Sequence, residues 1–171
     1  MADTAPSAAP PAPPTDLTMG ILARRRIEAE IIKPIYEEMK TAFGVEAARG
    51  VIERAVKKAA LESARAFAAT EKGGTSLRSF AALQPLWQKE DALRLDVLRS
   101  DDKAMDYNVT RCRYAEMYHA MGLGEIGHLL SCNRDATFIE GYDPSIKMER
   151  TQTIMQGASH CDFRYRAAPA K

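Results

Sequence analysis

The sequence lacks the features that mark membrane, secreted and nucleic-acid-binding proteins. No uninterrupted apolar run approaches the roughly 18 residues of a membrane span, and the N-terminus lacks the basic and apolar segments of a secretory signal. Lys and Arg number 24 against 23 acidic residues, so the net charge of +1 gives no electrostatic reason to expect nucleic acid or an anionic membrane. We therefore expect a cytoplasmic protein with a small-molecule partner.

Motifs of several large enzyme classes are also missing. The chain contains no GxSxG elbow, no P-loop, no GxGxxG fingerprint and no HExxH pair. Each of these motifs places a nucleophile, a phosphate-binding backbone or a pair of zinc ligands in a fixed local geometry. Their absence removes the usual hydrolase, NTPase, dinucleotide-binding and zinc-protease hypotheses.

Cysteine is scarce, and the three present do not form a disulfide framework. Cys112, Cys132 and Cys161 cannot all pair within the chain, so we predict reduced thiols. Polar or charged residues flank two of them, since Cys132 precedes Asn-Arg-Asp and Cys161 lies between His160 and Asp162. Such neighbours are typical of reactive or metal-binding thiols. A zinc site is disfavoured because no CxxC pair exists and adjacent strand residues point to opposite faces, so no metal is predicted.

The remaining composition predicts one globular domain preceded by a tail. Residues 1–14 are mostly Pro and Ala and are predicted to be disordered. Residues 15–171 form a chain that is long enough to bury its own core, because 46% of the whole sequence is hydrophobic. We predict a single α+β domain over this range.

The first half of the chain is predicted to be helical. Apolar residues recur at helical spacing over residues 17–43, with a kink or break near Ile32 and Lys33 because Pro34 removes a backbone donor. The charged face of this helix, which includes Arg24, Arg25 and Glu28, is interpreted as solvent-exposed. A second helix over residues 45–70 is rich in alanine, which permits close approach of another helix within the chain or in a homo-oligomer.

The second half mixes strands and short helices. Residues 76–87 are predicted to form a third helix, and Trp87 in it is assigned to core packing. Hydrophobic alternation predicts one hairpin over residues 92–109 and another with strands at 147–155 and 161–165; between them, helical spacing covers 112–121 and a shorter turn 124–130. The fold class is therefore α+β, with an antiparallel sheet of about four strands in two hairpins after a helical half.

Strand alternation assigns faces to the residues of the last hairpin. Cys161 shares a face with Phe163, while Asp162 points the other way. In the partner strand Thr151 and Thr153 share one face, and Arg150 lies on the other, where an inward arginine would need a carboxylate. On the preceding helix Cys112 and Glu116 are four residues apart and share a face, although a surface glutamate is the commoner arrangement.

Three sequence blocks resemble those of a known family. VTRCRYAEMYHAMG, LLSCNRD and RTQTIMQGASHCDFRY occur in the order found in the L-2-amino-thiazoline-4-carboxylic acid hydrolase family, and the resemblance is strongest from residue 108 to residue 165. It implies a cofactor-independent hydrolase that opens a small carboxylated heterocycle at a C=N or amide-like carbon. Such chemistry needs a nucleophile, a proton shuttle and a cation for the substrate carboxylate.

The resemblance also implies roles for individual residues. Cys161 or Cys132 would be the nucleophile if catalysis is covalent; Asp135, Glu116 or Asp162 would activate water or protonate the leaving atom. Arg150 would hold the carboxylate, with Thr151, Thr153 and Phe163 beside the substrate. Two other hypotheses stay open: a non-catalytic small-molecule sensor resembling 4-vinyl-reductase-like domains, and a zinc-binding module.

Overall fold

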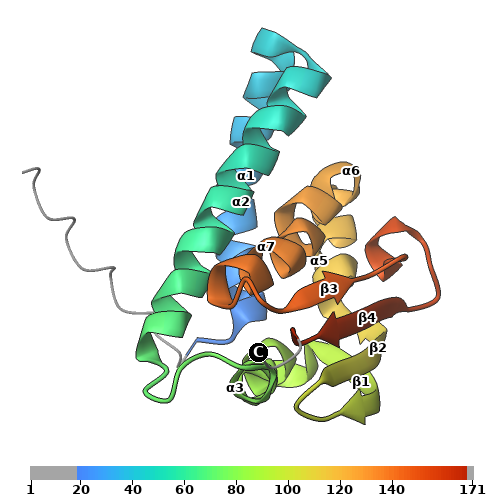
Figure 1. Cartoon of the computed structure of the whole chain (residues 1–171). Coiled ribbons are helices and arrows are strands. Elements are labelled where there is room, and N and C mark those ends of the chain that lie inside the picture. The colour runs from blue at the N-terminus through green and yellow to red at the C-terminus, as the bar shows by residue number, and fades with distance from the viewer. Residues whose placement is uncertain (1–18, 169–171) are drawn as a thin grey trace, which may run out of the picture.

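The computed structural model describes residues 19–168, so the predicted tail at residues 1–14 and the first residues of the predicted N-terminal helix lie outside the described residues. Two long antiparallel helices stand beside a four-stranded sheet and a set of shorter helices (Figure 1). This arrangement confirms the predicted α+β class. No helix within the described range combines the length and apolar character needed to cross a membrane.

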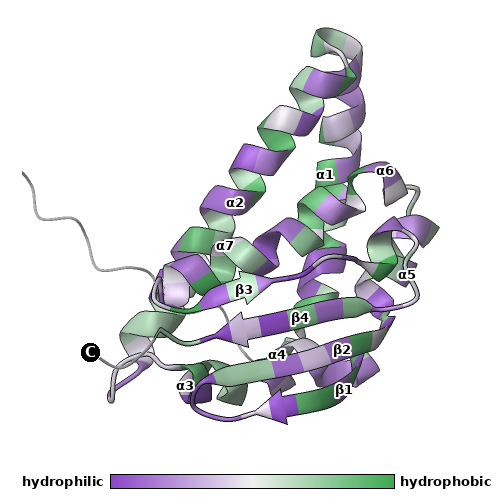
Figure 2. Cartoon of the chain, turned by 45° about the vertical axis from the view of Figure 1, so that its right-hand side comes forward, coloured by the Kyte–Doolittle hydropathy of each residue, from purple (hydrophilic) through white to green (hydrophobic). Residues whose placement is uncertain are grey.

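The two long helices form a hairpin with a one-residue connection. Helix α1 spans Ile21–Phe43 and α2 spans Val45–Thr70. Gly44 between them has a φ of 84°, a conformation that glycine adopts without the steric cost of a side chain. The tip of this hairpin projects well beyond the rest of the molecule (Figure 2), and only its base contributes to the site described below.

Of the kink or break predicted near Ile32 and Lys33, the break is wrong, because α1 continues through Pro34 as one helix. Proline removes one backbone donor, and that loss is tolerated here because packing holds the helix on both sides. Ala29 before the proline and Tyr36 after it are both buried against the body of the protein, whereas Pro34 is exposed.

The alanine-rich helix α2 makes its close approach inside the chain. Its partner is α7, Asn133–Tyr142, a helix that hydrophobic spacing did not reveal. A Cβ placed at Gly141 of α7 would lie 2.9 Å from the Cβ of Ala64 and 3.0 Å from the carbonyl oxygen of Leu61. Small residues on both helices therefore allow α7 to lie directly against α2.

Between the helical hairpin and the sheet, the predicted third helix is two short helices, α3 (Leu77–Ala82) and α4 (Gln84–Gln88). Ser76 caps α3 by accepting a hydrogen bond from the Ser79 amide, and Ser79 returns one from its hydroxyl to the backbone of Ser76. Pro85 lies in the first turn of α4, where a missing amide hydrogen costs nothing. Pro85 thus lies at the start of a helix.

The sheet is antiparallel, with strand order β1-β2-β4-β3. Strands β1 (Leu93–Ser100) and β2 (Ala104–Cys112) form the first predicted hairpin, which is confirmed. Strand β4 (Cys161–Arg166) pairs with β2, and β3 (Lys147–Glu149) pairs with β4 at the edge.

The second predicted hairpin is shorter than the alternation suggested. Residues 150–153 are not in a strand, and Ile154–Gln156 is a 3₁₀ turn. The reason is local: one carboxylate oxygen of Asp162 accepts hydrogen bonds from the amides of both Thr151 and Gln152, each at 2.9 Å. A side chain therefore satisfies the donors that a strand ladder would have used, and the chain leaves the sheet after Glu149.

Helices α5 (Arg113–Ala120) and α6 (Gly124–Gly127) follow the first hairpin, and α6 leads into a π-helical turn, His128–Cys132. The expected helix at 112–121 and the turn near 124–130 are thus present. A π turn holds one extra residue per turn and is frequent at functional sites. The π turn joins α6 to α7 without a loop, so these three elements form one continuous helical segment.

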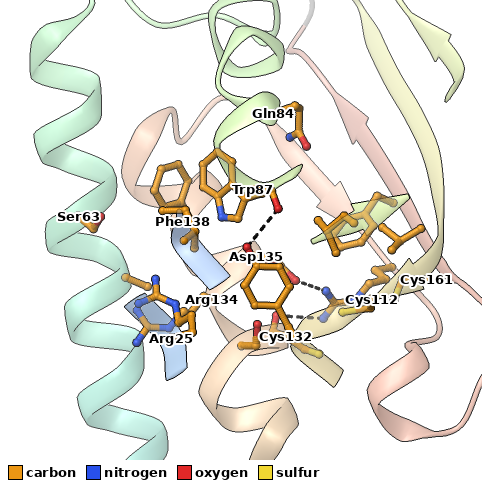
Figure 3. Close-up of a pocket in the computed structure, with 18 of the residues that line it drawn as sticks. Arg25, Ser63, Gln84, Trp87, Cys112, Cys132, Arg134, Asp135, Phe138 and Cys161 are labelled. Carbon is orange, nitrogen blue, oxygen red and sulfur yellow. Dashed lines mark hydrogen bonds and ion pairs between the residues drawn. The ribbon is translucent and has the colours of Figure 1, made fainter. Parts of the chain in front are cut away.

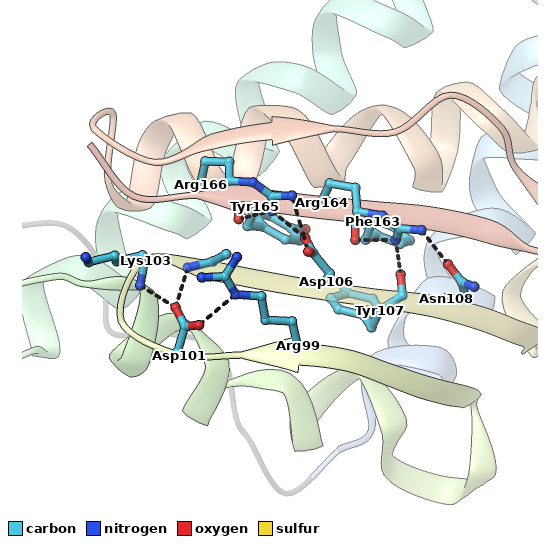
Figure 4. A network of polar contacts seen from close by, with 11 residues as sticks. Arg99, Asp101, Lys103, Asp106, Tyr107, Asn108, Phe163, Arg164, Tyr165 and Arg166 are labelled. Atoms are coloured by element: carbon cyan, nitrogen blue, oxygen red, sulfur yellow. Dashed lines mark hydrogen bonds and ion pairs between the residues drawn. The ribbon is translucent and has the colours of Figure 1, made fainter. Parts of the chain in front are cut away.

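The two faces of the sheet differ as alternation predicts. Cys161, Phe163 and Tyr165 are buried on the face toward α7. On the outer face Arg164 donates to the Asn108 side-chain oxygen at 3.0 Å, and Arg166 forms an ion pair with Asp106 (Figure 4). These cross-strand contacts tie β4 to β2, which fixes the register of the inward residues.

Candidate functional site

A cavity of about 120 Å³ lies between the inner face of the sheet, α2, α4 and α7 (Figure 3). Aromatic side chains form much of its wall, and the Trp87 and Phe138 rings meet edge to face at 5.2 Å between centroids. A cavity of roughly 150 Å³ is enough to enclose benzene. The volume here is slightly smaller but of the same order, so the largest ligand that it suits has one small ring; Trp87, which was assigned to core packing, lines that space.

All three cysteines line the cavity, although they are far apart in the sequence. Cys112 ends β2, Cys132 ends the π turn, and Cys161 begins β4 beside β2. None is in a disulfide. Burial raises the pKa of Cys112 to about 11 and that of Cys132 to about 12, and it also raises the pKa of Cys161. At neutral pH the cavity holds three protonated thiols.

Asp135 and Arg150 form an ion pair at the cavity wall. Arg150 also donates from Nη2 to the carbonyl oxygen of Cys132 at 3.1 Å, and its guanidinium carbon lies 5.1 Å from the centroid of the Phe163 ring. The predicted need of Arg150 for a carboxylate is thus met within the chain. Since Asp135 lies in the first turn of α7, directly after the π turn, that turn sets where the carboxylate points.

The environment of Asp135 is enclosed. The side chain lines the cavity and is 31% exposed, so it is mostly surrounded by protein. Burial raises the pKa of the Asp135 carboxyl, and the positive charge of Arg150 limits that rise. A carboxyl with a raised pKa can exchange a proton nearer neutral pH, which is what a general acid or base needs.

A second group of charges lies along the cavity at the base of α1. Glu28 is an acceptor for Arg24 at 2.9 Å, for Arg25 at 2.6 Å and for Arg134 at 3.5 Å. Arg24, Arg25 and Arg134 all line the cavity, and the side chains of Arg25 and Arg134 are only 12% and 15% exposed. The interpretation of this part of α1 as a solvated face is therefore wrong for Arg25.

Four of the residues assigned by the resemblance lie away from the cavity lining. Glu116 is exposed and pairs with Arg111 at 2.9 Å, because Cys112 belongs to β2 and not to the helix that carries Glu116. Asp162 faces outward and accepts the Thr151 hydroxyl at 2.6 Å. Thr153 is buried and donates to the side-chain oxygen of Gln156 at 3.0 Å. These three contacts shape the chain around the site.

The other five assigned residues come together in the cavity: Cys132, Asp135, Arg150, Cys161 and Phe163. Sequence reasoning missed Arg25 and Arg134, which look like ordinary surface charges when each is considered alone. One signal was available for Arg134, because it lies in the Cys132 to Asp135 block that also supplies two of the residues above. No arrangement of three or more His, Cys, Asp or Glu residues within 19–168 could hold a metal ion.

Solved structures with a similar fold include small-molecule-binding proteins. The phenol-responsive sensory domain of the transcription activator PoxR, crystallised with phenol, has a TM-score of 0.52 and 16% identity over 86% of this chain and 76% of that chain. Trafficking protein particle complex subunit 3 from Naegleria fowleri, covalently bound to palmitic acid, has a TM-score of 0.49 and 12% identity over 85% and 96%. At 16% identity the PoxR domain shows a similarity of fold alone. No curated protein matches the chain.

A family model gives a more specific match. Residues 24–165 match the model described as L-2-amino-thiazoline-4-carboxylic acid hydrolase, which covers most of the chain and includes every residue of the three blocks noted in the sequence. The matched range begins at Arg24 in α1 and ends at Tyr165 in β4, so it contains both charge groups and all three thiols of the cavity.

Proposed function

This chain belongs to the L-2-amino-thiazoline-4-carboxylic acid hydrolase family, and on that premise we propose that it hydrolyses a small carboxylated heterocycle at a C=N or amide-like carbon, with Asp135 as the group that activates water. The observation that carries the proposal is the enclosed Asp135 carboxyl, paired with Arg150, in a cavity sized for one ring.

The reaction with a cyclic amidine of the thiazoline type balances with one acid-base residue. Asp135 takes a proton from water as the oxygen bonds to the carbon of the protonated amidine. The carbon-sulfur bond then breaks, its electron pair goes to sulfur, and Asp135 returns the proton to that sulfur. The remaining hydroxyl proton leaves to solvent as the carbonyl forms. The product is a ring-opened thiol with a urea-type group.

Arg150 acts in this scheme as a positioning residue. Its guanidinium donates to the Cys132 carbonyl oxygen and lies over the Phe163 ring. These two contacts hold the guanidinium in place, and the guanidinium in turn orients the carboxylate of Asp135. The same positive charge limits how far burial raises the pKa of Asp135. An acid-base group in an enclosed site needs that limit, because a fully protonated carboxyl could not accept a proton from water.

The raised thiol pKa values favour activated water over a covalent cysteine mechanism. A thiolate is the nucleophilic form of cysteine, and reactive cysteines have a lowered pKa because a nearby cation or helix terminus stabilises the anion. Here burial raises the pKa of all three thiols. The thiols then serve as a polarizable wall against which a sulfur-containing ring can pack.

The test is a turnover assay with purified full-length protein. A panel of thiazolines, hydantoins, lactams and cyclic amidines, each with a carboxylate, is followed for ring opening by absorbance, and new thiol is detected with a chromogenic disulfide. We expect turnover of at least one member by wild type and by Cys161→Ser and Cys132→Ser. If either variant kept its fold but lost turnover, the result would contradict the activated-water mechanism and favour a covalent cysteine mechanism.

A second candidate is a binding protein without catalysis. It is favoured by the PoxR sensory domain, which shares the fold and was crystallised with phenol, a single-ring ligand. The aromatic wall and small volume of the present cavity would suit such a ligand as well. No turnover across the panel, together with saturable binding of one member, would support this function over the hydrolase.

A further inference from the structure

Arg25 at the base of α1 and Arg134 in α7 share a single carboxylate, that of Glu28. Three guanidinium groups, of Arg24, Arg25 and Arg134, contact the carboxylate of Glu28. The other acid of the cavity, Asp135, is paired with Arg150. Arg25 and Arg134 thus share the one carboxylate of Glu28, which leaves one positive charge of this pair unmatched beside the cavity.

Burial makes this excess costly. The side chains of Arg25 and Arg134 are 12% and 15% exposed, so solvent screens them poorly. Burial and the charge of Arg25 together lower the pKa of Arg134 to about 10, which still leaves it protonated at neutral pH. Two cations held close together in a partly dry site are stabilised by any anion that enters between them.

The geometry of Arg134 suits a planar anion. Its Nε donates to the carbonyl oxygen of Leu130 at 2.9 Å, in the π turn, and its Nη2 reaches Glu28 at the long distance of 3.5 Å. The backbone contact fixes the guanidinium plane, while the contact with Glu28 is weak. An anchored guanidinium is the group that best recognises a carboxylate through two parallel hydrogen bonds.

We propose that Arg25 and Arg134 form the subsite for a carboxylate of the ligand, so that the cavity selects single-ring monoanions. Figure 3 shows the two arginines together on one side of Asp135 and the thiols Cys112 and Cys161 on the other. A ring whose carboxylate rests on the arginines would therefore extend toward Asp135 and the thiols.

This assignment moves the carboxylate contact away from Arg150. The guanidinium of Arg150 is already engaged by Asp135 and by the Cys132 carbonyl oxygen. A substrate carboxylate there would meet Asp135 with no spare cation to offset the repulsion, whereas Arg25 and Arg134 together carry one charge more than Glu28 neutralises. The identity of the ligand as a carboxylated ring rests on the proposed function, but the charge preference of the subsite can be measured without turnover.

The experiment is isothermal titration of the full chain with pyrrole-2-carboxylate and with pyrrole-2-carboxamide. Both probes have one ring of similar shape, neither has the ring C=N bond that the proposed reaction opens, and only the first is an anion. We expect the carboxylate to bind at least about tenfold more tightly than the amide, as a charged hydrogen bond is worth roughly 1.5–3 kcal/mol.

Variants then locate the preference. Arg134→Gln and Arg25→Gln should each weaken binding of the carboxylate by about tenfold or more and leave binding of the amide unchanged. Arg134→Lys keeps the positive charge but cannot form two parallel hydrogen bonds, so its affinity for the carboxylate should lie between those of wild type and Arg134→Gln. Arg78→Gln is the matched control, because Arg78 pairs with Asp102 on the surface with its side chain 81% exposed. Circular dichroism checks that each variant is folded.

Two results would overturn the subsite. One is equal binding of the two probes, or no binding of the carboxylate at millimolar concentration. The other is a selective loss in Arg150→Lys while both Arg25→Gln and Arg134→Gln bind as wild type. Failure of the proposed function would give another result: no member of the panel would be turned over, while the carboxylate would still bind through Arg25 and Arg134.

Discussion

The guanidinium of Arg150 and the carboxylate of Asp135 form an ion pair across the cavity wall, joining the segment after β3 to the first turn of α7. Arg150 is anchored by the Cys132 carbonyl oxygen and the Phe163 ring, so the pair is held by three different parts of the chain. Because both groups are enclosed, removing either one leaves the other without its counter-charge.

The first prediction concerns stability. Arg150→Met should lower the free energy of unfolding at pH 7 by about 3 kcal/mol, because Asp135 would remain enclosed without a cation. Without that cation its pKa rises further above the unfolded value of about 3.9. The folded variant therefore has its full stability below about pH 4, where Asp135 is protonated in both the folded and the unfolded state. It loses that stability as the pH rises through the raised pKa of Asp135 in the folded state.

Urea denaturation of Arg150→Met at several pH values measures this effect. The deficit relative to wild type should be small near pH 4 and should grow toward neutral pH. Adding Asp135→Asn to the variant removes both charges and should recover most of the loss. A deficit that is constant with pH would mean that packing, and not the charge of Asp135, causes it.

The second prediction concerns catalysis. Asp135→Asn should lower kcat by roughly 10² to 10⁴, because the amide cannot take a proton from water. Glu116→Gln is the matched control: its carboxylate pairs with Arg111 on the surface and should leave kcat within about twofold of wild type. The measurement is steady-state turnover of the substrate found in the panel. Equal losses in the two variants would contradict the assignment.

The third prediction concerns thiol reactivity. Because burial raises the pKa of Cys112 to about 11 and of Cys132 to about 12, alkylation by iodoacetamide at pH 7.5 should be far slower than for a free cysteine. The rate should keep rising beyond pH 9, where a free thiol has nearly reached its plateau. Mass spectrometry of peptides identifies which thiol reacts. Fast modification of one of them at neutral pH would restore the covalent mechanism.

The fourth prediction concerns the contact between α2 and α7. Gly141→Ala would place a Cβ 2.9 Å from the Cβ of Ala64, and overpacking of this kind costs roughly 1–3 kcal/mol. Gly50→Ala in α2 meets only the flexible end of Arg54 at 3.3 Å. It should stabilise the protein by up to about 1 kcal/mol, since alanine favours helix more than glycine does. In thermal unfolding, Gly141→Ala should have a lower melting temperature than wild type and Gly50→Ala a higher one.

Local patterns predicted the faces of the sheet correctly. The alternation of Cys161, Phe163 and Tyr165 is confirmed, because a strand with one buried face imposes a period of two whatever surrounds it. The prediction of the partner strand was wrong beyond Glu149, for a reason that the alternation of apolar residues cannot show. The Asp162 side chain takes up the amides of Thr151 and Gln152, and this contact depends on the loop that brings residue 162 back to residue 151.

The site could be predicted only in part. The blocks that carry the family resemblance contain Cys132, Asp135, Arg150 and Cys161, all of which line the cavity. The contribution of α1 was missed because Arg25 lies more than a hundred residues before the other groups. A guanidinium on a helix looks solvated in sequence, and only the packing of α1 beside the π turn shows otherwise.

The cavity draws its walls from almost the full described length of the chain, from Met19 before α1 to Tyr165 in β4. No contiguous fragment contains the site, because the arginines, the thiols and the acid meet only after the sheet has closed against both long helices. Ligand occupancy is therefore coupled to global unfolding and not to the opening of a single loop. A bound ring should slow hydrogen exchange in β4 and at the base of α1 together.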